Sequence, residues 1–123
     1  MITIIAATRV AAESHDAFVA IARATIDASR VEEGCLHYSC SEDLSEPGTF
    51  RWIEQWRDIA TFNAHAESLH HLNFLEQLAD PQKVRRSGSA EGQYLDGEKL
   101  SPDERLERGF SPMSAPNAIA TKA

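Results

Sequence analysis

Length, composition and charge restrict what this chain can be. Its 123 residues suffice for one domain with a hydrophobic core, and 42% hydrophobic with 25% charged residues is ordinary for a globular protein. The net charge of −7 argues against nucleic acid or an anionic membrane as a partner, because both bind basic surfaces. No apolar run reaches the roughly 18 residues that a membrane span requires.

The first part of the chain predicts a strand followed by a helix. Residues 2–10 are apolar on both faces, which is typical of a central strand covered on both sides. Ser14 is a suitable N-cap for an amphipathic helix that ends near Val31. Gly34 can then take the left-handed conformation that is common after a helix.

A hairpin should come next. Alternation predicts strands at residues 35–43 and about 50–56, separated by turn residues. Cys35 and Cys40 should lie on opposite faces of the first strand, so they are not expected to pair with each other. Free thiols and a start without a basic leader favour a cytoplasmic location. The second strand gathers four large side chains on one face, namely Phe50, Trp52, Glu54 and Trp56.

Two helices and a last strand complete the predicted domain. Asp58 and Ser68 are suitable caps for these helices, and the second should end at Asp80-Pro81. A weaker strand, interrupted by glycines, lies within residues 83–94. The apolar side of the second of these helices is expected to comprise Leu69, Leu72, Leu75 and Leu78.

The order β-α-β-β-α-β predicts an α+β, ferredoxin-like fold, with helices on one face of an antiparallel sheet. Helices on one face cannot also cover both the doubly apolar first strand and the Phe50–Trp56 face. We therefore expect an exposed apolar sheet face and a homodimer in which two sheets close face to face. Residues 1–96 form the expected domain and 97–123 a C-terminal extension, in which a short helix is predicted over 102–108.

Several motifs resemble those of one family. Glu33-Gly34-Cys35-Leu36-His37-Tyr38 follows the first helix, Glu54-x-Trp56 closes the third strand, and Ala64-His65, Ser68-x-His70 and Phe74 follow in the helices. Over roughly residues 1–95 this pattern resembles the antibiotic biosynthesis monooxygenase family of dimeric α+β barrel proteins. The resemblance implies a homodimer with a pocket between sheet and helices in each protomer.

The resemblance also implies a range of activities. Family members include oxygenases that act on quinols or polycyclic phenols without metal or flavin, haem-degrading enzymes, and proteins that isomerise or bind small metabolites. The haem-degrading relatives carry an asparagine on the first strand, and residues 2–10 contain none. The aromatic-polyketide oxidisers resemble this chain at Trp56 but carry an asparagine on the same strand, which residues 50–56 lack. Both specialised activities are therefore disfavoured.

Cofactor-free oxygenation requires a base, a donor for an oxyanion and a dry pocket. His65 suits the base, because an unperturbed imidazole titrates near 6.5. Trp56 offers an indole N–H and an aromatic wall. We predict these two as catalytic residues, with a core tryptophan and a structurally hydrogen-bonded histidine as the alternatives. Glu54 should orient His65 or form a structural salt bridge. The predicted substrate-binding residues are Glu54, Tyr38, Phe62, His70 and Phe74.

Spacing gives no support for a metal, a nucleotide or a nucleophilic cysteine. No two histidines lie four apart on one helix, although His65, His70 and His71 cluster with Glu67. His71 is expected to face solvent. The sequence therefore predicts no metal and no other cofactor. It indicates a cofactor-independent monooxygenase acting on an electron-rich quinol or phenol. A non-catalytic dimeric protein that binds small molecules, and an isomerase of the same fold, are the alternatives.

Overall fold

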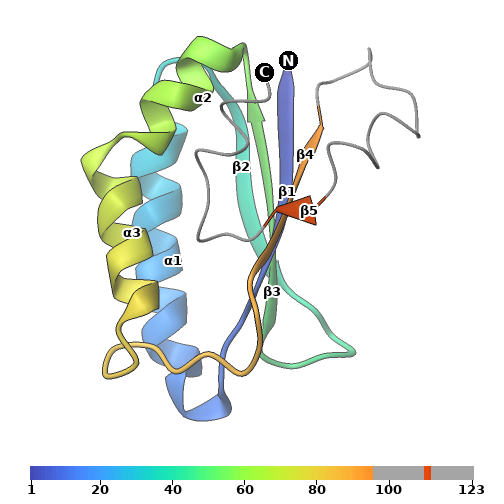
Figure 1. Cartoon of the computed structure of the whole chain (residues 1–123), viewed down its shortest axis with the longest axis vertical. Coiled ribbons are helices and arrows are strands. Elements are labelled where there is room, and N and C mark those ends of the chain that lie inside the picture. Colours follow the sequence, from blue (N-terminus) through green and yellow to red (C-terminus); the bar gives the residue numbers. More distant parts are fainter. Residues whose placement is uncertain (96–109, 112–123) are drawn as a thin grey trace.

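The computed structural model describes residues 1–95 and 110–111, which include one antiparallel sheet with helices on one side (Figure 1). The strand order is β2-β3-β1-β4-β5, and the sheet is open rather than closed into a barrel. This is the predicted α+β, ferredoxin-like arrangement. The elements are β1 (Ile2–Arg9), a 3-10 turn (Ala12–Ser14), α1 (His15–Arg30), β2 (Cys35–Glu42), β3 (Thr49–Trp56), α2 (Ile59–Ala66), α3 (Leu69–Ala79), β4 (Glu91–Leu95) and β5 (Phe110–Ser111).

One predicted element begins later than expected, and another lies outside the described residues. The last strand of the domain begins at Glu91, because the preceding loop is held by buried Val84 and by a bridge between Val10 and Arg86. The helix expected over residues 102–108 lies outside the described residues, as does the rest of the extension except 110–111. None of the described helices has the length and apolar composition needed to cross a membrane.

The aromatic face of β3 packs against the helices of its own chain. Phe18 of α1 lies against Phe50, with ring centroids 4.6 Å apart, and also contacts Trp52 edge-on. The indole Nε1–H of Trp52 donates to Thr8 Oγ1 at 3.1 Å, so this buried donor is satisfied. This face is therefore covered within the chain, so any exposed apolar sheet face lies on the other side of the sheet.

The opposite face of the sheet is only partly apolar. Ile5 and Ile53 are directly paired across β1 and β3 and are 37% and 43% exposed. Their neighbours on the same face include Arg51 and Gln55. The central position of β1 is confirmed, but within one chain it is not covered on both sides. The homodimer stays a prediction, and it now concerns this outer face.

Ser14 does not cap α1 as predicted. It ends the 3-10 turn with φ −101° and ψ 2°, a conformation that does not aim its hydroxyl at the first helical amides. Its Oγ instead accepts from the backbone N–H of Arg85 at 2.8 Å, which ties the loop before β4 to the start of α1. The other end follows the prediction, since Val31 is the C-cap and Gly34 has φ +81°.

A β-bulge in β2 changes the faces of the two cysteines. Cys35 pairs with Trp56 and Tyr38 with Glu54, so one extra residue is inserted between Cys35 and His37. The insertion turns Cys35 to the same inner face as Cys40, and both are partly buried against the core. The predicted opposite faces are therefore wrong. Both thiols are free.

The helices after β3 begin where predicted. Asp58 and Thr61 form a reciprocal capping box on α2, and Ser68 Oγ accepts from His71 N at the start of α3. The buried face of α3 differs from the predicted leucine stripe, because His71, Phe74 and Leu78 point inward while Leu69 and Leu72 are exposed. The helix presents aromatic rings to Trp52 and His65, and this packing overrides the leucine periodicity.

Candidate functional site

A chain of polar side chains runs through the aromatic core. The indole Nε1–H of Trp56 donates to Glu54 Oε1 at 3.0 Å, and that oxygen lies 3.5 Å from His65 Nε2. On the other side of the ring, His65 Nδ1 lies 2.7 Å from Glu32 Oε1. His70 Nε2 hydrogen-bonds the same glutamate oxygen. We call these five residues, Trp56, Glu54, His65, Glu32 and His70, the polar chain.

Four elements position the polar chain. Glu54 and Trp56 occupy successive inward positions of β3, and His65 lies in the last turn of α2. His70 lies in the first turn of α3, and Glu32 in the turn that follows α1. Ser68 connects the helices that carry the two histidines. Its Oγ donates to the carbonyl of His65 in α2 at 2.6 Å, and the same residue is the N-cap of α3, which carries His70.

The polar chain leads from the surface into the core. The side chains of His70 and Glu32 are 28% and 16% exposed, whereas those of Glu54 and His65 are 7% and 1% exposed. Trp56 is fully buried, and its ring stacks on His65 with centroids 4.5 Å apart. Buried ionisable groups are costly unless they are paired, so their presence here marks a candidate functional site.

Burial shifts the pKa values of the inner residues. It raises the pKa of Glu54 to about 7, against the opposing hydrogen bond from Trp56, with a further rise from the charge of Glu32. Burial also lowers the pKa of His65 to about 3, and the nearby charge of His70 adds to this effect. At neutral pH His65 is therefore neutral, while Glu54 exchanges its proton near physiological pH.

The hydrogen bonds around His65 indicate which of its ring nitrogens carries the proton. The Nδ1–H of neutral His65 donates to Glu32, which leaves Nε2 as an acceptor. Nε2 is buried and has no hydrogen-bond partner among the described residues, and it faces Glu54 Oε1. Because an ionised carboxylate only accepts, a hydrogen bond here requires either the acid form of Glu54 or a proton on Nε2.

The structure brings together most of the predicted site residues. Tyr38 lies edge-on to His65, with ring centroids 5.4 Å apart, and burial raises the pKa of its hydroxyl well above the usual value. Phe74 packs on Trp52 instead and reaches the polar chain through His71. Phe62 is buried on α2 in the hydrophobic core. Both ring nitrogens of His65 face carboxylates, so neither is free for a substrate in this conformation.

Two residues of the site escaped prediction from the sequence. Glu32 has no motif of its own, but it stands two residues before the left-handed Gly34. His71 was expected in solvent, yet it is buried with its ring 4.7 Å from His65, and burial lowers its pKa to about 4. The signal for His71 is its spacing, three residues before Phe74 and seven before Leu78.

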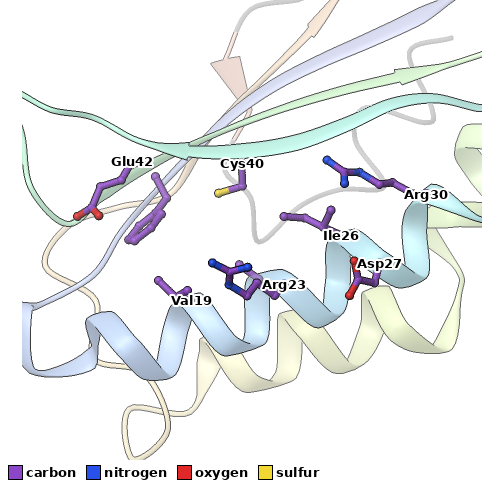
Figure 2. A pocket seen from close by; sticks show the side chains of 9 residues that line it. Val19, Arg23, Ile26, Asp27, Arg30, Cys40 and Glu42 are labelled. Atoms are coloured by element: carbon purple, nitrogen blue, oxygen red, sulfur yellow. The ribbon is translucent and has the colours of Figure 1, made fainter.

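The described cavities lie away from the buried end of the polar chain. One of about 350 Å³ opens between α1 and β2, and Figure 2 shows Arg23 and Ile26 of α1 facing Cys40 across it. Burial raises the pKa of Cys40 to about 12, so this thiol is a poor nucleophile. A second cavity of about 280 Å³ is lined by Arg30 and by residues 35–38. Neither of these two cavities is lined by Trp56 or His65.

Comparison with known proteins places the chain in a family. The model of the antibiotic biosynthesis monooxygenase family matches residues 1–77, more than half of the chain. The chain belongs to the antibiotic biosynthesis monooxygenase family. The matched segment contains the whole polar chain, so membership confirms the resemblance that the sequence motifs indicated.

Individual similar proteins agree with this assignment. "Putative monooxygenase YcnE" of Bacillus subtilis is 33% identical over 95 residues, which cover 74% of this chain and all of that protein. An uncharacterised protein of Synechocystis is 32% identical over 91 residues, and the matched part spans 71% of this chain but only 62% of that relative. The crystal structure of PA3566 from Pseudomonas aeruginosa, 29% identical, superposes with a TM-score of 0.67 over 81% of this chain and 94% of that chain. Family membership supports a monooxygenase or small-molecule-binding role without identifying a substrate.

Proposed function

We propose that this member of the antibiotic biosynthesis monooxygenase family oxidises an electron-rich quinol or phenol with O₂. The observation that supports this most directly is the buried Glu54 carboxyl, which lies between the indole N–H of Trp56 and the unpartnered Nε2 of His65. Groups that exchange a proton near neutral pH inside an apolar site suit general base catalysis.

Glu54 serves as the base in this proposal, and His65 positions it. The carboxylate takes and keeps the hydroxyl proton of the substrate, and the resulting acid donates a hydrogen bond to His65 Nε2, whose Nδ1–H is fixed by Glu32. The electron-rich phenolate then reduces O₂ itself. For a quinol, one oxygen atom enters the ring and the other leaves as water, so quinol and O₂ yield a hydroxyquinone and water. The substrate supplies all the electrons.

Access to Glu54 requires movement of the helices. Trp56, His65 and Tyr38 close over the carboxyl in the described conformation. His65 belongs to α2, which has eight residues and would be marginally stable alone. We infer that α2 and α3 move away from β3 to admit a planar substrate, and that the closed form afterwards excludes water.

Oxygen consumption tests this function. Purified protein, treated with a chelator and free of flavin, is mixed with a panel of quinols and polycyclic phenols in an oxygen electrode. We expect uptake of O₂ that depends on the protein, and one ¹⁸O atom per product molecule from ¹⁸O₂. Activity that disappears in the chelator and returns with added metal would overturn the cofactor-free mechanism. Turnover of the same compounds without O₂ would favour the isomerase.

The cleft between α1 and β2 favours a second candidate, a non-catalytic small-molecule-binding role. Its volume of about 350 Å³ lies in the range of small-molecule pockets, and it combines apolar Val19 and Phe50 with the guanidinium groups of Arg23 and Arg30. This role predicts a rise in Tm with bound ligand and no oxygen consumption with any substrate.

We also propose that the protein forms a homodimer through the outer face of its sheet. Ile5 and Ile53 form the apolar centre of the outer sheet face, where a second copy would cover them. We expect the wild-type protein to sediment as a dimer and Ile53→Lys to shift it toward monomer, because a buried lysine at the interface would lack a partner. The matched control is Val31→Lys, an exposed position outside the sheet. A wild-type monomer at micromolar concentration would contradict the dimer.

A further inference from the structure

Three potential metal ligands meet at the outer end of the polar chain. Glu32, His65 and His70 each offer one ligand atom, and these atoms all lie within 4.8 Å of one another. They come from the turn after α1, from α2 and from α3, so spacing along one helix could not reveal them. Two imidazole nitrogens and one carboxylate oxygen are the donor set of many zinc sites and of non-haem iron sites.

The geometry requires little change to hold an ion. His65 Nδ1 and His70 Nε2 already point at the same oxygen, Glu32 Oε1. With metal–ligand distances of about 2.0–2.2 Å, ligand atoms around a tetrahedral ion lie roughly 3.3 Å apart. Small side-chain rotations would therefore place an ion where the two N–H protons now lie. The partial exposure of His70 and Glu32 provides a path from solvent.

The second, independent observation is the unpartnered nitrogen on the far side of His65. When Nδ1–H donates to Glu32, Nε2 is left buried without a hydrogen-bond partner within residues 1–95 and 110–111, 3.5 Å from Glu54 Oε1. A metal on Nδ1 reverses the tautomer, so that Nε2–H donates to Glu54. Metal-bound histidines almost always donate their other N–H to a carboxylate or a carbonyl, and Glu54 is placed for this role.

We propose that the protein binds one divalent first-row transition metal ion, such as Zn²⁺, through Glu32, His65 Nδ1 and His70 Nε2. Glu54 is the carboxylate that orients the metal-bound His65. The site goes beyond the proposed oxygenation, with which it shares Glu32 and His65, and Zn²⁺ binding is measured without any substrate or O₂. Cations that prefer oxygen ligands, such as Mg²⁺ and Ca²⁺, are not expected to bind with two imidazoles.

Titration of the metal-free protein tests this site. Tag-free protein is stripped with a chelator and dialysed, and Zn²⁺ is added in a calorimeter. We expect one Zn²⁺ per chain and a higher Tm in its presence. Co²⁺ should give the intense visible absorption of four- or five-coordinate sites. A failure to bind Zn²⁺ or a pale octahedral Co²⁺ spectrum would overturn the proposal.

Variants separate this site from adventitious binding. His70→Ala removes a partly exposed ligand and should weaken Zn²⁺ binding at least about tenfold. Glu32→Gln, which keeps the shape of the side chain, should weaken it as well. His37→Ala is the matched control, because His37 is an exposed histidine on β2 that bonds only Ser39 among the described residues. Equal loss in His70→Ala and His37→Ala would overturn the assignment. Zn²⁺ binding without oxygen uptake would reject the proposed function alone.

Discussion

Replacing Gly34 with alanine should lower the free energy of unfolding by more than about 2 kcal/mol. The φ of Gly34 is +81°, a left-handed conformation that costs other residues roughly 1–2 kcal/mol. A Cβ at this position would also lie 2.4 Å from Cβ and Cγ2 of Thr61. Thr61 belongs to the capping box of α2 and cannot move without opening it. Both costs add, and urea denaturation measures their sum.

Gly88→Ala is the matched control for this substitution. Gly88 is not in the left-handed region, and a Cβ there would be 3.2 Å from Cδ of Arg9, a side-chain atom that can shift by a few tenths of an ångström. We expect little change in its unfolding midpoint. If Gly34→Ala were equally harmless, the close approach of the turn to α2 would be wrong. The placement of Glu32, two residues earlier, would then lose its support.

The core face of the domain could be predicted because it follows a simple period. Alternation along residues 50–56 identified the inward side chains of β3, and all four of them are buried. Asp58 and Ser68 were predicted as caps from residue type alone, and both accept backbone hydrogen bonds. Where local chemistry and burial demand the same arrangement, sequence is sufficient.

Packing decided the positions that could not be predicted. The bulge before His37 is a change of register against β3, and nothing in residues 35–43 marks it. On α3, hydropathy alone predicts that leucine side chains point into the core and that histidine side chains point into solvent. The rings of His71 and Phe74 instead fill the space beside His65 and Trp52, so Leu69 lies in solvent.

Only the part of the candidate site that β3 and α2 contribute could be predicted closely from the sequence. Glu54, Trp56 and His65 lie within twelve residues of sequence, so a strand-to-helix junction brings them together. Glu32 is 33 residues from His65 and reaches it through the end of α1 and the turn at Gly34. Such long-range polar contacts leave no periodic signal in a single sequence.

Replacing Glu54 with glutamine should change how stability depends on pH. Burial raises the pKa of Glu54 from 4.5 to about 7, so folding favours the protonated acid. The group contributes stability that is complete below about pH 4.5 and is lost as the pH rises through about 7. Glutamine stays neutral and can donate its amide N–H to His65 Nε2. Relative to wild type, Glu54→Gln should therefore gain about 3 kcal/mol between pH 4.5 and pH 8.

The titrations of His65 and His71 act in the opposite direction and are common to both proteins. Their pKa values are lowered by burial, so they cost stability as the pH falls below about 6.5. Comparing the two proteins at each pH removes this shared contribution. The measurement is urea denaturation of chelator-treated protein across this range. A constant difference between the proteins would mean that Glu54 is ionised at all these pH values.

The same substitution should abolish most of the proposed oxygenation. Glutamine cannot accept the substrate proton, so kcat/KM should fall by about 100-fold or more while the fold becomes more stable at pH 8. Glu33→Gln is the control, since Glu33 is an exposed carboxylate that pairs with Arg57 at the surface. A purely structural carboxyl would predict higher stability with unchanged turnover. Lower turnover together with higher stability is the signature of a group that is retained for chemistry at a cost to folding.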